Sequence, residues 1–201
     1  MPVSATSATA AASGVPVTPS VSVPVTPSVS RPTLSPPRRQ LSLGGSCDSL
    51  LPLAQIWQSS GLTFAGLTRF VVGVPEPNIG RLAYLNCRYG IPPQHGTAPA
   101  EPLIEIGVSL YRTPAQAQAR ARGTVDDYLY NDATEANRTV AGHHAILLTG
   151  GVGPGYDVPL LVLAAGQRTI AVSVATRAGT SATRWAATVA LTVLALTRTA
   201  G

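Results

Sequence analysis

The chain has 201 residues, enough for one ordinary domain or for a smaller domain with a tail. Its 14 basic residues are all arginines and stand against 9 acidic residues, a formal net charge of +5. Arg31, Arg38 and Arg39 precede Leu41, which leaves 11 arginines against 9 acids in the rest of the chain. Those arginines are scattered and aromatic residues are few, so we expect no nucleic-acid partner.

Residues 1–45 are rich in Pro, Ser and Thr, and we predict that they are disordered. The unit Val-Pro-Val-Thr-Pro-Ser-Val-Ser occurs twice in succession, at 15–22 and 23–30. Proline favours polyproline II, and Ser and Thr cannot build a core. We therefore expect a stalk that holds a single folded domain, residues 46–201, away from a membrane or cell wall. A dispensable low-complexity extension is the alternative.

The segment that follows Met1 has neither the charged region nor the apolar region of a secretory signal. No run of 18 or more apolar residues occurs in the chain, so we expect no transmembrane segment in it. An extracytoplasmic location, which the stalk favours, then requires a start site upstream of Met1 or prior removal of the signal. Retention inside the cell is the alternative.

Two cysteines are present, Cys47 and Cys87. Cys87 alternates with the apolar Leu85 and Tyr89 on a predicted strand, so it should face the core, where a helix that begins near Cys47 can reach it. We predict one disulfide that ties this first helix to the sheet; two buried free thiols are the alternative. No Cys-x-x-Cys motif is present, which favours a structural bond over a redox centre.

The first half of the folded part predicts one helix and three strands. Pro52 suits the first turn of a helix that ends at Gly61. Strands are expected over residues 69–74 and 81–89, on either side of a turn rich in Pro, Asn and Gly. A third strand is expected over 104–110, where apolar and polar residues alternate.

The segment Thr113–Gln116 predicts the start of a middle helix. Its Thr-Pro-Ala-Gln sequence supplies a hydroxyl N-cap, a proline at the first position and a glutamine at the third, which together form a capping box. Apolar residues keep helical spacing to about Asn131. Asp126 and Asp127 fall on the exposed side, and we find no second carboxylate that would pair with them for acid–base chemistry.

Three more strands and a last helix complete the pattern. The strands are expected over residues 143–148, 156–163 and 168–176. The middle one is apolar on both faces, which places it inside the sheet. Thr180 or Ser181 caps the helix, which is too short to span a bilayer. The residues expected on its packing side are Trp185, Val189, Val193 and Leu196.

The predicted order is therefore helix, three strands, helix, three strands, helix. Short links within each group of strands favour antiparallel pairing. The sequence predicts an α+β fold, with a mostly antiparallel sheet of about six strands flanked by three helices.

Candidate sites for catalysis or metal binding are few. His143 and His144 are adjacent and point to opposite faces of a strand, so they cannot easily share a metal with each other, and His95 lies in a distant loop. His144 and Asp157 are candidates for a hydrolase triad, but no Gly-x-Ser-x-Gly motif accompanies them.

The glycine-rich stretch 149–155 lacks the Lys-Ser/Thr ending of a phosphate loop, and we expect a hairpin connection there. Glu101 and Glu105 are expected to be solubilising edge or loop residues. We therefore assign no catalytic, cofactor-binding or metal-binding residue, and we expect no cofactor.

Several motifs together resemble a known family. They are Cys-Asp-Ser-Leu-Leu-Pro at 47–52, Cys-Arg-Tyr at 87–89, Thr-Pro-Ala-Gln-Ala at 113–117 and the Ala/Leu-rich C-terminal helix. The chain resembles, over residues 46–200, small secreted proteins and lipoproteins of actinobacteria that carry a domain of unknown function. The resemblance implies a sandwich similar to the PsbP and Mog-one folds, a Cys47–Cys87 disulfide and an envelope location. It implies no catalytic residues, and this chain lacks the lipobox cysteine before the stalk.

From these observations we expect a non-enzymatic, extracytoplasmic and monomeric domain. It should bind a partner protein or a small envelope ligand between sheet and helices. The alternatives are a sensory or regulatory module of a membrane protein and, less favoured, a secreted hydrolase.

Overall fold

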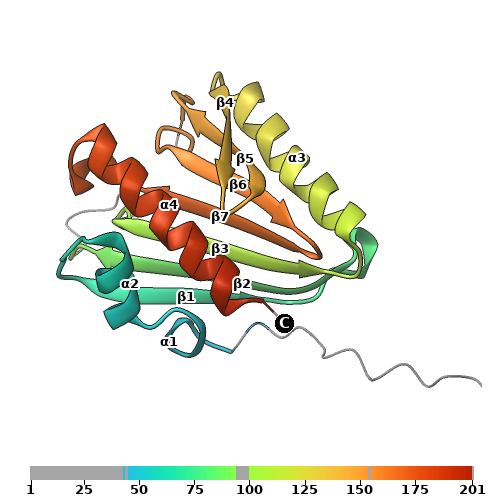
Figure 1. Ribbon diagram of the computed structural model, residues 1–201, viewed down its shortest axis with the longest axis horizontal. Coiled ribbons are helices and arrows are strands. Elements are labelled where there is room, and N and C mark those ends of the chain that lie inside the picture. The colour runs from blue at the N-terminus through green and yellow to red at the C-terminus, as the bar shows by residue number, and fades with distance from the viewer. Residues whose placement is uncertain (1–42, 44, 94–99, 154, 201) are drawn as a thin grey trace, which may run out of the picture. The chain divides into compact units, whose positions relative to one another are not determined.

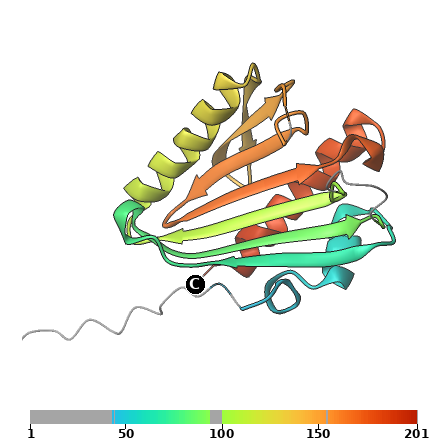
Figure 2. The same ribbon diagram turned by 180° about the vertical axis from the view of Figure 1, so that it is seen from behind.

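The computed structural model describes residues 43, 45–93, 100–153 and 155–200, so His95 and nearly all of the predicted stalk lie outside the described residues. The described residues belong to one compact unit, residues 39–201, which is a sheet with helices on both faces (Figures 1 and 2). In chain order the elements are α1 (Cys47–Leu50), α2 (Leu53–Ser60), β1 (Leu67–Gly73), the 3-10 helix η1 (Pro77–Ile79), β2 (Arg81–Ile91), β3 (Ile104–Tyr111), α3 (Pro114–Tyr130), β4 (Thr134–Val140), β5 (His143–Thr149), β6 (Leu160–Ala165), β7 (Arg168–Val174), the 3-10 helix η2 (Thr176–Ala178) and α4 (Ser181–Arg198).

The seven strands form one antiparallel sheet in the order β1-β2-β3-β7-β6-β5-β4. This confirms the α+β class and the antiparallel pairing. The strand that the sequence did not predict is β4, with the sequence Thr-Glu-Ala-Asn-Arg-Thr-Val. It forms the edge beside β5, where neither face needs a continuous apolar row, so no alternation marks it.

The predicted first helix is two short helices. Leu51 separates them in a non-helical conformation, with φ −135° and ψ 68°, because the residue before a proline avoids the helical region. Pro52 is consequently the N-cap of α2 and does not lie within its first turn. Gly61 ends α2 with φ 67°, as predicted, and the Ser46 hydroxyl caps α1 by accepting a hydrogen bond from the Ser49 amide at 3.3 Å.

A disulfide joins Cys47 at the start of α1 to Cys87 in the middle of β2. Both residues are fully buried, and their Cα atoms lie 5.7 Å apart. The predicted bond is therefore present. Close by, the Tyr89 hydroxyl donates a hydrogen bond to the Leu51 carbonyl oxygen at 2.7 Å. The junction between α1 and α2 is thus attached to β2 by one covalent bond and one buried hydrogen bond.

The main core lies between the sheet and helices α2 and α4, which stand in front of the sheet in Figure 1 and behind it in Figure 2. Helix α4 packs here mainly through Ala187, Leu191 and Ala195. The predicted packing side was partly wrong, because Val193 is 39% exposed. Alanines carry little hydrophobic signal in the sequence, yet their small side chains let the helix approach the sheet closely.

Helix α3 lies on the opposite face of the sheet. The capping box at Thr113 is formed as predicted, with the Thr113 hydroxyl accepting from the Gln116 amide at 3.2 Å. Val125 of α3 packs with Val162 of β6 and Leu148 of β5 in a second, smaller core. Strand β6 is covered on both faces, as predicted.

In the part of the chain that the structure describes, no helix combines the length and the apolar character needed to cross a membrane.

Removal of the disulfide should lower the free energy of unfolding substantially. Cys47 and Cys87 are 40 residues apart, and freeing a loop of that length in the unfolded chain costs about 4 kcal/mol of stability. We expect this loss in the double variant Cys47→Ala/Cys87→Ala, measured by urea unfolding. Dithiothreitol should destabilise the wild type by a similar amount and leave the double variant unaffected. A wild-type unfolding midpoint that does not respond to reductant would contradict this prediction.

Candidate functional site: a groove on the open face of the sheet

Helix α3 covers only part of its face of the sheet. It contacts β6 and β7 most extensively, and no helix crosses in front of β1, β2 and β3 in Figure 2. A groove of about 730 Å³ runs between α3 and the uncovered part of β2, β3 and β7. The β2–β3 and β5–β6 loops contribute to its rim.

The strand register organises the floor of the groove. Antiparallel pairing places residues of β2, β3 and β7 directly beside one another, so the floor consists of three rows. The rows are Tyr84–Ser109–Thr169, Asn86–Gly107–Ala171 and Arg88–Glu105–Ser173. The outer rows are polar, whereas the middle row contains the two smallest side chains. The centre of the floor is therefore a dip.

Two glycines lie beside the Tyr84 ring, and only one of them constrains its position. A Cβ atom at Gly73 would come within 2.7 Å of Cδ1 of Tyr84, so glycine is required there for the ring to keep its place. A Cβ atom at Gly107 would make only ordinary contacts, at 3.8 Å to Tyr84 and 3.9 Å to Ala171. Packing does not require glycine at position 107, and its missing side chain leaves space above the floor.

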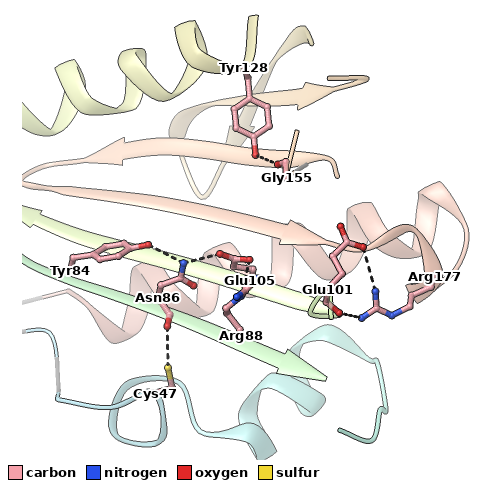
Figure 3. Close-up of polar contacts among 9 residues, drawn as sticks. All are labelled: Cys47, Tyr84, Asn86, Arg88, Glu101, Glu105, Tyr128, Gly155 and Arg177. Atoms are coloured by element: carbon pink, nitrogen blue, oxygen red, sulfur yellow. Dashed lines mark hydrogen bonds and ion pairs between the residues drawn. The ribbon is translucent and has the colours of Figure 1, made fainter. Parts of the chain in front are cut away.

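A hydrogen-bonded network crosses the floor (Figure 3). The Asn86 side-chain amide donates to Oε1 of Glu105 at 2.7 Å and to the hydroxyl of Tyr84 at 2.9 Å. Nε of Arg88 lies 3.3 Å from Oε2 of Glu105, so the carboxylate faces a cation. On the other side of β2, a sulfur of the disulfide lies 3.9 Å from the Asn86 carbonyl oxygen; a disulfide sulfur has no hydrogen, so this is a packing contact. The network is thus built on the strand that the disulfide anchors.

The prediction that Glu105 lies at the edge of the sheet or in a loop was wrong. Glu105 is on β3, which lies between β2 and β7 in the sheet. The alternation of residues 104–110 placed it on a polar face, but the partners of that face depend on the register between strands, which local sequence does not specify.

Tyr128 connects α3 to the glycine-rich loop between β5 and β6. Its hydroxyl donates to the Gly155 carbonyl oxygen at 2.9 Å (Figure 3). Its ring packs edge-on against Tyr156, with the ring centroids 4.8 Å apart. The loop is the hairpin connection expected from its glycines, and Gly150 and Gly153 have φ values of 79° and 102°.

Both tyrosines of the groove stay protonated well above neutral pH. Burial, followed by the negative charge of Glu105, raises the pKa of Tyr128 to about 12. Burial also raises the pKa of Tyr84, although the hydrogen bond from Asn86 works in the opposite direction. The two phenols are therefore neutral hydrogen-bonding groups at physiological pH.

The charges around the groove are balanced. At the rim, Glu101 forms an ion pair with Arg177 at 3.6 Å (Figure 3). Arg120 of α3 and Asp157 of the β5–β6 loop also line the groove, and neither forms an ion pair with another described residue. The site thus has no excess of one charge.

The predicted histidine geometry is confirmed for His143 and His144. His143 pairs with Val140, whose side chain belongs to the core under α4. The His144 ring lies on the α3 side and its Nε2 is 3.0 Å from Oδ1 of Asn137. Neither lines the groove, and His95 is outside the described residues.

The acidic candidates are also dispersed. Asp126 and Asp127 are exposed on α3, as predicted, whereas Asp157 lies at the rim of the groove. Among the residues described here, no three His, Cys, Asp or Glu side chains lie close enough to hold a metal ion.

No protein-family model matches the chain, and a search of curated proteins also finds no match.

Replacement of Tyr128 by Phe should change the alkaline stability of the domain. A pKa of about 12 in the folded state and about 10 in the unfolded state stabilises the fold fully below pH 10, and this contribution disappears as the pH rises to about 12. Tyr128→Phe removes the ionisable group, so its free energy of unfolding should fall less than that of the wild type between about pH 9 and pH 11.5.

At neutral pH the same variant should be about 1 kcal/mol less stable, because it loses the hydrogen bond to Gly155. Urea unfolding across the pH range measures both effects. Tyr130→Phe, at a side chain on the same helix that is 90% exposed, is the matched control and should behave like the wild type. Parallel pH curves for wild type and Tyr128→Phe would show that the prediction is wrong.

Proposed function

We propose that this is an extracytoplasmic domain that binds a small ligand in the groove without transforming it. The observation that carries the proposal is the dip over Gly107 and Ala171 in the lining of the groove, where even a Cβ atom at position 107 would make only ordinary contacts. The volume of about 730 Å³ is within the range of roughly 300–1,000 Å³ typical of small-molecule sites.

The chemistry of the lining supports recognition over catalysis. A general base requires a pKa near the working pH, and a nucleophile requires a base within hydrogen-bonding reach. Glu105 is engaged by Arg88 and Asn86, and the two tyrosines are held protonated by burial. These groups are suited to donate and accept hydrogen bonds from a fixed position.

Two features support the extracytoplasmic location. Disulfides persist in oxidising compartments, and the Cys47–Cys87 bond is fully buried beneath α1. The Pro/Ser/Thr repeats at 15–30 are typical of stalks. As part of the same proposal we place the domain with the actinobacterial secreted proteins and lipoproteins whose motifs it resembles.

Filling the dip tests the binding site. Gly107→Leu should place a branched side chain over the floor, whereas Gly107→Ala adds only a methyl group with ordinary contacts and is the matched control. We expect fragments found by ligand-observed NMR to shift the amide resonances of Gly107 and Ala171 in the wild type. Their affinity should fall at least about tenfold in Gly107→Leu and by less in Gly107→Ala, whose methyl group fills less of the dip. Fragments that bind elsewhere, or equally to all three proteins, would refute the site.

The location is tested by the state of the cysteines in the cell. Protein recovered from the cell envelope, denatured and alkylated before reduction, should contain no reactive thiol, because both sulfurs form the disulfide. The same sample should show two thiols after reduction, which serves as the control. Two reactive thiols before reduction would rule out the proposed oxidising compartment.

A further inference from the structure

The floor of the groove presents an unsatisfied acceptor. Because the Asn86 amide nitrogen donates to the Glu105 carboxylate, a flipped amide would place two acceptors together, so the positions of its oxygen and nitrogen are fixed. The remaining atom, Oδ1, is buried and has no hydrogen-bond partner among the described residues. A buried acceptor without a partner is uncommon, and this one has almost no accessible surface, so it marks a polar floor without itself contacting a ligand in the groove.

A free donor lies beside this acceptor. The Tyr84 hydroxyl accepts a hydrogen bond from Asn86, so its own proton is available to another acceptor. Burial raises the pKa of Tyr84, so the proton is retained at neutral pH. The Tyr84 proton can be accepted by a ligand hydroxyl group.

The charge balance disfavours an ionic ligand. Glu105 is compensated by Arg88, and Glu101 is compensated by Arg177. Arg120 and Asp157 both line the groove, so a ligand that carries one charge would be attracted by one of these side chains and repelled by the other. An uncharged ligand avoids this conflict and the desolvation cost of a buried ion.

The rest of the floor is suited to several hydroxyl groups. Ser109 and Thr169 lie in the row of Tyr84, and Ser173 lies in the row of Glu105. Ser109 and Thr169 lie on neighbouring strands about 4.8 Å apart, Ser173 lies four residues further along β7, and each hydroxyl can donate and accept. The Tyr84 ring adds an aromatic surface beside them.

On the basis of the proposed binding function, we infer that the ligand is an uncharged, polyhydroxylated compound, namely a short neutral saccharide. Its hydroxyl groups bind the Tyr84 hydroxyl and the serine and threonine hydroxyls of the floor, and its ring lies over the dip at Gly107.

The test is a titration with neutral sugars. Maltose, lactose and N,N′-diacetylchitobiose serve as probes, with glucose 6-phosphate and glucosamine as charged comparisons, and affinities are measured by ligand-observed NMR and calorimetry. At least one neutral disaccharide should bind more tightly than both charged sugars. Equal or tighter binding of a charged sugar would overturn the inference.

Variants of the floor locate the interaction. Tyr84→Phe keeps the ring and removes the hydroxyl, and it should weaken sugar binding about three- to tenfold. Ser109→Ala provides a second measurement that does not touch the Asn86 network and should also weaken binding. Tyr130→Phe is the matched control on an exposed tyrosine and should leave the affinity unchanged. Sugar binding that is insensitive to both floor variants would overturn the inference.

The outcomes also separate this inference from the proposed function. If fragments bind at Gly107 but no neutral sugar does, the saccharide inference is wrong and the binding function stands. If sugars bind equally well to Gly107→Leu, the sugar site is not the groove and the inference is wrong. If neither fragments nor sugars bind at Gly107, both proposals are wrong.

Discussion

Two long helices cannot cover both faces of a seven-stranded sheet, and the organisation of this domain follows from that shortage. Helix α4, helped by α1 and α2, buries one face beneath an apolar core. Helix α3 packs over β5 to β7 on the other face and leaves β2 and β3 without a helix above them. The two outer rows of the groove floor place polar side chains on this uncovered face, which suits contact with water.

The two faces of β2 consequently have different structural roles. Cys87 faces the core and joins the disulfide, whereas its neighbours Asn86 and Arg88 face the groove and hold Glu105 in place. Because the core side is covalently anchored, the polar side has a fixed backbone on which to orient its side chains. Binding groups that are already oriented lose less conformational entropy when a ligand arrives.

Local patterns predicted most of the fold but only part of the site. The hydroxyl caps at Thr113 and Thr180 and the alternation of β3 follow from neighbouring residues, and they were predicted correctly. The partners of Glu105 depend on strand register, a non-local property. The edge strand β4 has only one buried residue, Val140 at its end, and therefore carries no periodic signal. The helix α4 packs through alanines that a hydrophobic pattern undervalues, as the exposure of Val193 shows.

The position of the disulfide also determines how the domain bears mechanical load. A pull on the polypeptide ahead of Cys47 passes through the sulfur–sulfur bond to Cys87 in β2. Residues 48–86, which include α2 and β1, lie inside the covalent loop and carry no tension. Strand β2 is hydrogen-bonded to β1 on one side and to β3 on the other, so the load is shared across the sheet and does not peel the first helices away. Arg88 follows Cys87 in the same strand and belongs to the groove floor, so it is the first floor residue through which this tension passes.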